Sequence, residues 1–331
     1  MSKLKMRTAR VLRTIARTNA SAGKVIEHLY NRPKVVTGSS FDHTSGRNYT
    51  IVRSASAPEA KRVGIYLRGG CDVPAVFGVA KMMRASVTGT LAIWRDPVHI
   101  TGTRSDLLLQ ALDGIDPSAT SAIEEVSKRL QLRRGYFNPR FFDPTFTVRR
   151  QEALGPFPKS VVVLSVGSDY TRRLYRHREH GFLVDPGGFW LGNNIESAIA
   201  DPDSVKWFAK TFKSVGRLSV EQFHASFGRL VSEVKARANA HVAVFNVLTV
   251  NPLERTHNYG LIDEHDTSRR RDFIIALAEL SRELDFDVID VDRALKLHGL
   301  NGQVDFAHIT EAQFAPITAE CYRVFRQREL I

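Results

Sequence analysis

The sequence predicts an α/β fold built on a doubly wound parallel sheet, with a basic arm at its N-terminus. Apolar, β-rich runs alternate with stretches of helical period from residue 62 to the end of the chain, a pattern that builds a parallel sheet with helices on both faces. Right-handed crossovers then restrict the topology. Residues capable of chemistry follow the predicted strands, where open α/β sheets bind ligands. The expected architecture is therefore three-layered and flavodoxin-like.

The composition is that of an ordinary globular chain. Of the 331 residues, 43% are hydrophobic, and no uninterrupted apolar run approaches the length of a membrane span. The N-terminus lacks the apolar core of a signal peptide. The two cysteines, Cys71 and Cys321, are too few and too far apart for a disulfide framework. We therefore expect a cytoplasmic protein.

The positive charge is concentrated at the N-terminus. Of the formal net charge of +12, residues 1–62 contribute +10 (13 Lys and Arg against 3 acids) and residues 63–331 contribute +2 (34 against 32). We therefore divide the chain into a basic arm and linker at 1–60 and an α/β domain at 61–331, with an insertion at about 101–158.

The arm has the pattern of a basic amphipathic helix over residues 3–17. Leu4, Val11, Leu12 and Ile15 share one helical face, and four arginines lie elsewhere on the same helix. The pattern suits an anionic membrane surface reached through residues 1–30, an organelle transit peptide, or a helix packed on the body. Nucleic acid is disfavoured, because the arm has few aromatic side chains and no recognition motif.

The elements follow from local pattern. Residues 35–60 are rich in Ser, Thr, Gly and Ala and are expected to form a loop region with one short strand at 49–53. Apolar, β-rich runs predict strands at 62–68, 89–94, 160–166, 241–250 and 286–291. Helical spacing predicts helices at 75–84, 107–112, 121–132, 219–238, 267–284 and from 310 onward. Two helix starts carry capping-box pairs, Ser219 with Gln222 and Thr310 with Gln313.

Two further segments are expected to be loops. The aromatic-rich stretch 136–146 is a substrate wall or, as we expect, an ordered loop pinned to the core. The run at 172–180, rich in Arg and His, is expected to be a solvated basic loop, with an anionic substrate as the alternative. His177 and His180 lack a third ligand at a known spacing, so no metal is predicted.

Cys71 follows the first predicted strand of the domain, after the double glycine Gly69-Gly70 and before a predicted helix. At a helix N-terminus the backbone N–H groups and the helix dipole lower a thiol pKa and favour the thiolate. The same N–H groups can hold an oxyanion. The alternative is a small buried hydrophobic residue, which is common for a free cysteine.

Asp305 and His308 lie three residues apart, just before the last predicted helix. An Asp beside a His can fix the imidazole tautomer and stabilise the imidazolium. The alternative is that Asp305 caps a turn and His308 is a solvated loop residue. The apolar run 160–166 ends in Gly167-Ser168-Asp169, which places a third polar group at a strand end.

Taken together, these blocks resemble the SGNH (GDSL-type) hydrolase superfamily over roughly residues 62–328. Gly69-Gly70-Cys71 stands where the superfamily has a Gly-Asp-Ser turn, Gly167-Ser168-Asp169 where it has Gly-x-Asn-Asp, and Asp305-Phe-Ala-His308 matches its Asp-x-x-His block. A cysteine in place of the serine is similar to GSCFA-motif and capsule-biosynthesis proteins. Gly89 and Gly102 are both candidates for the second-block glycine.

The resemblance implies a Cys-His-Asp arrangement of Cys71, His308 and Asp305, with Gly70, Gly167, Ser168 and Asp169 binding the oxyanion or substrate. It implies no cofactor and an ester substrate, an acylated carbohydrate or polysaccharide being favoured, with hydrolysis or acyl transfer as the reaction. One departure matters: Asp169 stands where the family has an amide donor, and a carboxylate would repel the developing charge. Two alternatives remain: a non-catalytic carbohydrate- or nucleotide-binding module, and a membrane-surface adaptor dominated by the arm.

Overall fold

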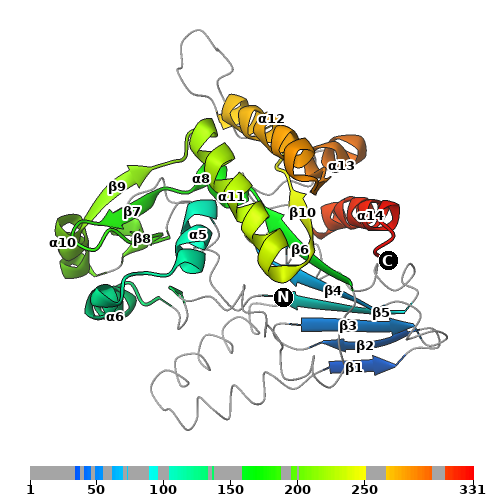
Figure 1. The fold of residues 1–331 in the computed structure, drawn as a ribbon, viewed down its shortest axis with the longest axis horizontal. Helices are drawn as coiled ribbons and strands as arrows, with labels where there is room; N and C mark the ends of the chain where they lie inside the picture. Colours follow the sequence, from blue (N-terminus) through cyan, green and yellow to red (C-terminus); the bar gives the residue numbers. More distant parts are fainter. Residues whose placement is uncertain are drawn as a thin grey trace.

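Five parallel strands form the centre of the protein in the computed structural model (Figure 1). They are β4 (Arg62–Leu67), β5 (Thr90–Arg95), β6 (Lys159–Ser165), β10 (His241–Phe245) and β11 (Asp287–Ile289). Their spatial order is β5-β4-β6-β10-β11, which is 2-1-3-4-5 in chain order. This is the flavodoxin-like doubly wound order, so the predicted fold class is confirmed.

The structure describes residues 34–37, 41–45, 49–54, 62–69, 73, 89–95, 104–132, 136–137, 159–187, 195–199, 201–250, 266–299 and 310–331. The predicted arm helix at 3–17 and the predicted helix at 75–84 lie outside these residues. Both stay predictions, as does the division into an arm, a domain and an insertion.

The loop interpretation of residues 35–60 is wrong for two segments. Besides the expected β3 (Tyr49–Ser54), the chain forms β1 (Lys34–Thr37) and β2 (Phe41–Ser45). The three strands pair antiparallel, and β3 pairs antiparallel with β5, so they extend the central sheet to eight strands. Short strands with Thr, Ser and charged residues give a weak local signal, and pairing with β5 supplies what local pattern does not.

Alternation along the central strands explains the two helical layers. In β6, Val161 and Val163 enter the core on one face of the sheet, and Val162 and Leu164 enter the core on the other. Strands buried on both faces read as the continuous apolar runs seen in the sequence. Each fully buried aliphatic side chain contributes roughly 1.5–3 kcal/mol relative to exposure.

Helices cover both faces (Figure 1). The core on one face includes α13 (Val291–His298) and α14 (Glu311–Gln327), and the core on the other includes α5 (Ser105–Asp113), α11 (Val220–Ala238) and α12 (Asp266–Leu284). The capping box predicted at Ser219 is present. The one predicted at Thr310 is not: α14 does begin after Thr310, but Gln313 Nε2 donates to the carbonyl oxygen of Gly299, 2.7 Å away at the end of α13. Helix α13 itself was missed by the sequence analysis.

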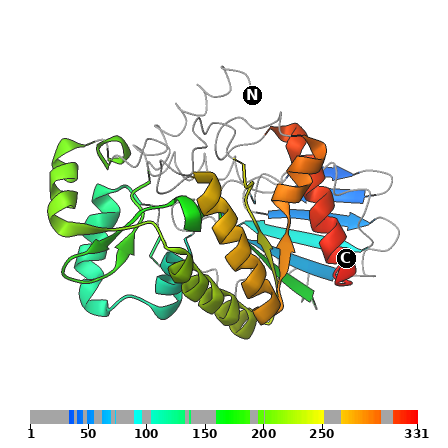
Figure 2. The ribbon, with the colours of Figure 1, turned by 90° about the horizontal axis from the view of Figure 1, so that it is seen from above.

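A smaller lobe lies beside α5, at the opposite end of the molecule from β1–β3 (Figure 2). It contains a second sheet of β7 (Leu174–His177), β8 (Leu183–Val184) and β9 (Phe212–Gly216), in the order β8-β7-β9. Its helices are η2 (Pro117–Ala119), α6 (Thr120–Arg129), α9 (Ile195–Ala198) and α10 (Pro202–Thr211). Phe182, Phe208 and Phe212 lie at the centre of its core.

The expectation of a solvated basic loop at 172–180 is wrong for the backbone of 174–177 and for two side chains, while Arg173, Arg176 and Arg178 are exposed as expected. This run contains β7, and the side chains of Arg172 and His177 are buried. Arg172 pairs with the equally buried Asp185, with Nη1 and Oδ2 3.4 Å apart. An arginine is buried at acceptable cost only when a carboxylate and carbonyl groups surround it, and Asp185 lies 13 residues further along the chain. Local sequence pattern therefore gives no sign of this burial.

Candidate functional site

The carboxyl ends of β4 and β6 meet at the point where the strand order reverses, which is where doubly wound sheets form their ligand crevice. A Cβ atom on Gly69 would lie 2.5 Å from Val73 Cγ2 and 3.0 Å from Ser165 Cβ. No larger residue fits there without displacing its neighbours. Gly69 therefore lets the turn after β4 lie directly against the end of β6, as the double glycine predicts.

Cys71 and Gly70 lie outside the described residues, between Gly69 and Val73 in the sequence. The flanking residues are both fixed: Val73 is fully buried and belongs to the same core cluster as Leu67 of β4 and Ile317 of α14. The described residues on either side of Cys71, Gly69 and Val73, therefore lie at the carboxyl end of β4.

Asp305 and His308 also lie outside the described residues, but the helix that follows them has a defined direction. At the C-terminal end of α14, Arg328 Nε lies 3.0 Å from Asp287 Oδ1, and Lys159 Nζ donates to the Glu329 carbonyl oxygen at 2.5 Å. Asp287 and Lys159 are the first residues of β11 and β6.

The C-terminal end of α14 therefore lies at the amino edge of the sheet. Its N-terminal end points toward the carboxyl edge, because a helix of 17 residues spans about 25 Å. His308 stands two residues before the N-cap, Thr310. The chain thus enters α14 at the same edge of the sheet at which β4 ends.

Gly167, Ser168 and Asp169 form the first turn of the short helix α8 (Gly167–Thr171), directly after β6. The N–H of Gly167 donates to Ser165 Oγ at 3.0 Å, and the N–H of Asp169 donates to the carbonyl oxygen of Val166 at 3.0 Å. These bonds fix the turn at the end of the strand. Ser168 is 5% exposed and Asp169 is fully buried.

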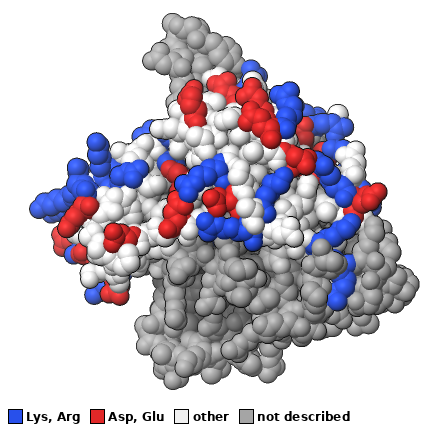
Figure 3. All heavy atoms as spheres, viewed as in Figure 1, with Lys and Arg blue, Asp and Glu red and all other residues white. Residues whose placement is uncertain are grey.

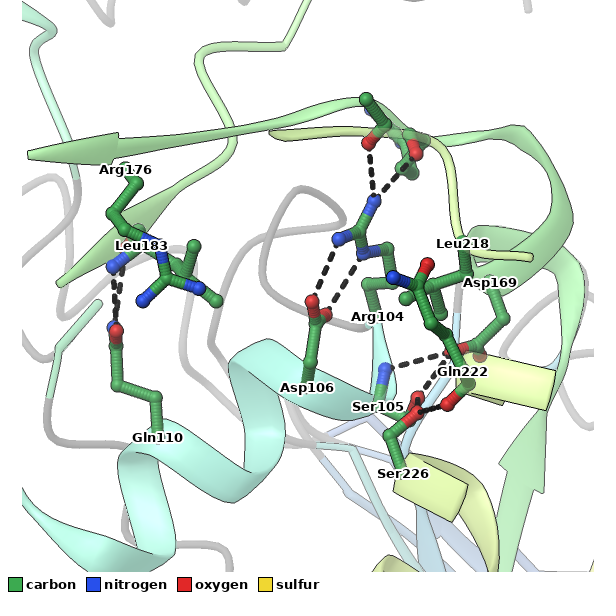
Figure 4. A network of polar contacts seen from close by, with 12 residues as sticks. Arg104, Ser105, Asp106, Gln110, Asp169, Arg176, Leu183, Leu218, Gln222 and Ser226 are labelled. Atoms are coloured by element: carbon green, nitrogen blue, oxygen red, sulfur yellow. Dashed lines mark hydrogen bonds and ion pairs between the residues drawn. The ribbon is translucent and has the colours of Figure 1, made fainter. Parts of the chain in front are cut away.

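The Asp169 carboxyl group contacts the N-terminus of α5 (Figure 4). Its Oδ1 accepts hydrogen bonds from the Ser105 N–H at 2.8 Å and from the Ser105 hydroxyl at 2.5 Å. Ser226 Oγ, from α11, lies 2.8 Å from Ser105 Oγ. Because Arg104 at the N-cap position makes no side-chain cap bond, Asp169 supplies the missing acceptor from 64 residues away.

Burial raises the pKa of Asp169 to about 7, and the two hydrogen bonds from Ser105 oppose the rise. The nearest strong cation, Arg104, is engaged elsewhere: its guanidinium donates to both carboxylate oxygens of Asp106, at 2.8 and 2.6 Å. Asp169 Oδ2 has no hydrogen-bond partner among the described residues. The carboxyl group can therefore exist in its neutral form near pH 7.

Three members of this cluster were missed by the sequence analysis: Ser105, Ser226 and Arg104. Ser105 opens a helix whose start was expected two residues later, so a polar residue at a helix start was the available signal. No local signal links it to Asp169.

One of the two candidates for the second-block glycine lies away from the crevice. Gly89 precedes β5 with φ +114°, so it lies at the amino edge of the sheet, away from the crevice. Gly102 lies outside the described residues.

His177 and His180 take part in hydrogen bonds and ring contacts within the small lobe. His177 Nδ1 accepts hydrogen bonds from the N–H groups of Glu179 and His180, at 3.3 and 3.1 Å, and its ring stacks on Phe182. Burial lowers the pKa of His177.

Among the described residues, no group of three or more His, Cys, Asp or Glu side chains is arranged to hold a metal ion. Nor is any described helix long and apolar enough to cross a membrane.

No protein-family model matches the chain, and no curated protein sequence matches it. Solved structures do match. An inhibitor-bound aryl esterase from M. smegmatis is 13% identical, covering 82% of this chain and all (100%) of that chain, with a TM-score of 0.40. An acetyl-xylooligosaccharide esterase from Geobacillus stearmophilus is 9% identical over 80% and 94%, with a TM-score of 0.39. An SGNH hydrolase from Slackia heliotrinireducens is 10% identical over 80% and 98%, with a TM-score of 0.36. At these identities and scores, family and activity have to be argued from the residues of this chain.

Proposed function

We propose that this chain is an SGNH-like enzyme that hydrolyses or transfers the acyl group of an ester, with Cys71 as nucleophile, His308 as base and Asp305 orienting the imidazole. What supports the proposal is the described chain that flanks these residues. Strand β4 ends at the carboxyl edge three residues before Gly70, Gly167 and Ser168 follow β6 there, and the N-terminus of α14 points there. The order of the three blocks along the chain is the one that the family resemblance requires.

In the proposed reaction the Cys71 thiolate attacks the acyl carbonyl carbon, and the C–O bond of the ester breaks as a thioester forms. The alcohol leaves with a proton from His308. Water, or the hydroxyl of an acceptor, then attacks the thioester while His308 takes its proton, and the thiolate is released. The backbone N–H group of Gly70, with Ser168, is the proposed oxyanion donor. The N–H of Gly167 is held by Ser165 Oγ, so Gly167 is proposed to line the substrate rather than to donate to the oxyanion.

Asp169 takes a different role from the amide donor of the family block. Its carboxyl group is fully buried and caps α5, so we propose that it shapes the α8 turn without contacting the ester. An acylated carbohydrate is the proposed substrate. A binding module without turnover is the alternative.

The test uses the two cysteines of the chain as target and control. Cys71 should react with iodoacetamide well below pH 8.5, the pKa of a free thiol being about 8.5. Cys321 is 1% exposed in the core, and burial raises its pKa, so it should not react in the folded protein. Mass spectrometry at pH 6–7 should therefore show one modification, lost in Cys71→Ala and kept in Cys321→Ala.

Turnover of p-nitrophenyl acetate and of acetylated xylo-oligosaccharides should fall at least a hundredfold in Cys71→Ala and in His308→Ala, roughly the size of a general-base contribution. The double variant should be little worse than either single variant, because parts acting as one unit are not additive. Carbohydrate binding that survives Cys71→Ala, with no turnover in the parent chain, would instead identify a binding module.

A further inference from the structure

One face of the small sheet β8-β7-β9 lies in the core of the small lobe. The other face carries both apolar and basic side chains, because Leu183, opposite Arg176, is buried in a second apolar cluster. In the β7–β9 pair, His177 stands opposite Phe212, and both are buried in the core of the small lobe. One residue earlier on β7, Arg176 stands opposite Lys213, so both lie on the other face. The N–H of Arg178 donates to the Thr211 carbonyl oxygen at 2.9 Å, which continues the same register. Arg176, Arg178 and Lys213 are exposed and together form what we name the basic face.

Like charges directly opposite each other on a sheet are destabilising. The exposed Glu179, next to Arg178 in the chain, lies 4.0 Å from His180 Nε2, a contact that is an ion pair only when His180 is protonated. The Arg176 guanidinium donates to a neutral group, the Gly181 carbonyl oxygen, at 3.0 Å.

Arg178 and Lys213 make no ion pair with any residue that the structure describes. Figure 4 shows Arg176 beside Leu183 and Gln110, and Figure 3 shows Lys and Arg side chains projecting from the end of the molecule that carries β9 and α10. The basic face therefore carries more cationic charge than the adjacent Glu179 offsets.

We propose that the basic face binds the carboxylate groups of an acidic polysaccharide whose acyl group occupies the crevice; the placement of that acyl group rests on the proposed function. Strand β7, which carries Arg176, begins three residues after α8, the helix that follows β6. Guanidinium groups bind carboxylates through two parallel hydrogen bonds.

The exposed hydrophobic side chains favour a sugar polymer over nucleic acids and membrane surfaces as the anionic partner. The large hydrophobic residues exposed in the described structure are Val215, Ile275 and Leu297. None is aromatic, so the described surface offers no stacking platform for nucleic-acid bases. Scattered single aliphatic residues also do not form the apolar face that a membrane-surface helix needs.

The experiment measures binding of polygalacturonate to the full-length chain carrying Cys71→Ala, which keeps turnover from affecting the measurement. The test variant adds Arg176→Gln and Lys213→Gln. The control variant adds Lys128→Gln and Arg271→Gln, which remove the same charge from exposed sites on α6 and α12. The control is needed because the basic N-terminal arm is present in every variant.

The test variant should bind roughly tenfold more weakly, the size expected from losing two exposed ion pairs, with a shallower salt dependence. The control variant should change affinity less than about twofold. In the chain with Cys71 intact, turnover of p-nitrophenyl acetate should be unchanged by the test substitutions, since a small neutral ester does not reach the basic face.

Equal weakening in the two variants would overturn the proposal, because binding would then follow net charge or the arm. Tighter binding of a single-stranded oligonucleotide or of phosphatidylglycerol vesicles, dependent on Arg176 and Lys213, would overturn it in favour of those partners. Loss of polymer binding in the test variant of a chain that turns over no ester would leave the basic face standing and remove the proposed enzyme function.

Discussion

At the scale of single residues, Asp169 shows how burial shifts the pKa of a carboxyl group. The folded protein holds the pKa of this carboxyl at about 7, against an ordinary value of 3.8. Because the pKa of Asp169 is higher in the folded state than in the unfolded state, its protonated form adds to the free energy of unfolding. This contribution is fully present below about pH 4 and is lost as the pH rises through about 7. About three pKa units correspond to roughly 4 kcal/mol.

Asp169→Asn should remove this loss. The amide oxygen can still accept the Ser105 hydrogen bonds, and the side chain no longer ionises. Urea unfolding at pH 5 and pH 8 should show the variant gaining stability over the parent at the higher pH. Exposed Asp272→Asn is the control and should give no such pH-dependent difference. A parallel shift of both variants at the two pH values would contradict the assignment of the titration to Asp169.

At the scale of elements, the two predicted capping boxes make a matched pair. Ser219 Oγ accepts from the Gln222 N–H at 3.1 Å, and Gln222 Oε1 accepts from the Ser219 N–H at 2.9 Å. Thr310 occupies the N-cap of α14 with no side-chain cap bond. Ser219→Ala should therefore destabilise the protein by about 1 kcal/mol.

Thr310→Ala should cost only a few tenths of a kcal/mol, since no cap bond is lost. Equilibrium urea unfolding followed by circular dichroism measures both. A cost for Thr310→Ala equal to that for Ser219→Ala would mean that Thr310 caps α14 in solution and that Gln313 does not bond to Gly299 as described.

At the scale of the whole molecule, buried arginines join the small lobe to the central sheet. Arg104 is 2% exposed, and its Nη1 donates to the carbonyl oxygens of Arg172 and Gly216, at 2.9 and 2.8 Å, at the start of β7 and the end of β9. Its other donors hold Asp106. One side chain thus ties α5 to two strands of the second sheet.

Arg104→Ala should cost about 3–5 kcal/mol, because it leaves two buried carbonyl oxygens and a carboxylate without their donor. Arg229→Ala is the control: its pair with Asp113 is 52% and 42% exposed, so its loss should cost less than about 1 kcal/mol. Thermal unfolding gives both values. Similar costs for the two substitutions would show that Arg104 does not join the lobes.

The sequence by itself determined the parts of this protein that depend on near neighbours. The continuous apolar run at 160–166 indicated a strand buried on both faces, Ser219 and Gln222 indicated a helix start, and Gly69 indicated a close approach of the backbone after β4. Each signal acts within about four residues, the range over which helix periods, caps and turns operate.

Tertiary structure decided everything that needed a distant partner. Whether Arg172 lay in solvent depended on Asp185, and whether residues 34–37 and 41–45 formed strands depended on the antiparallel pairing of β3 with β5. The bonds from Ser105 to the Asp169 carboxyl group join residues 64 positions apart at the start of α5. Buried charges and short edge strands are stable only beside their partners, so a local pattern cannot reveal them.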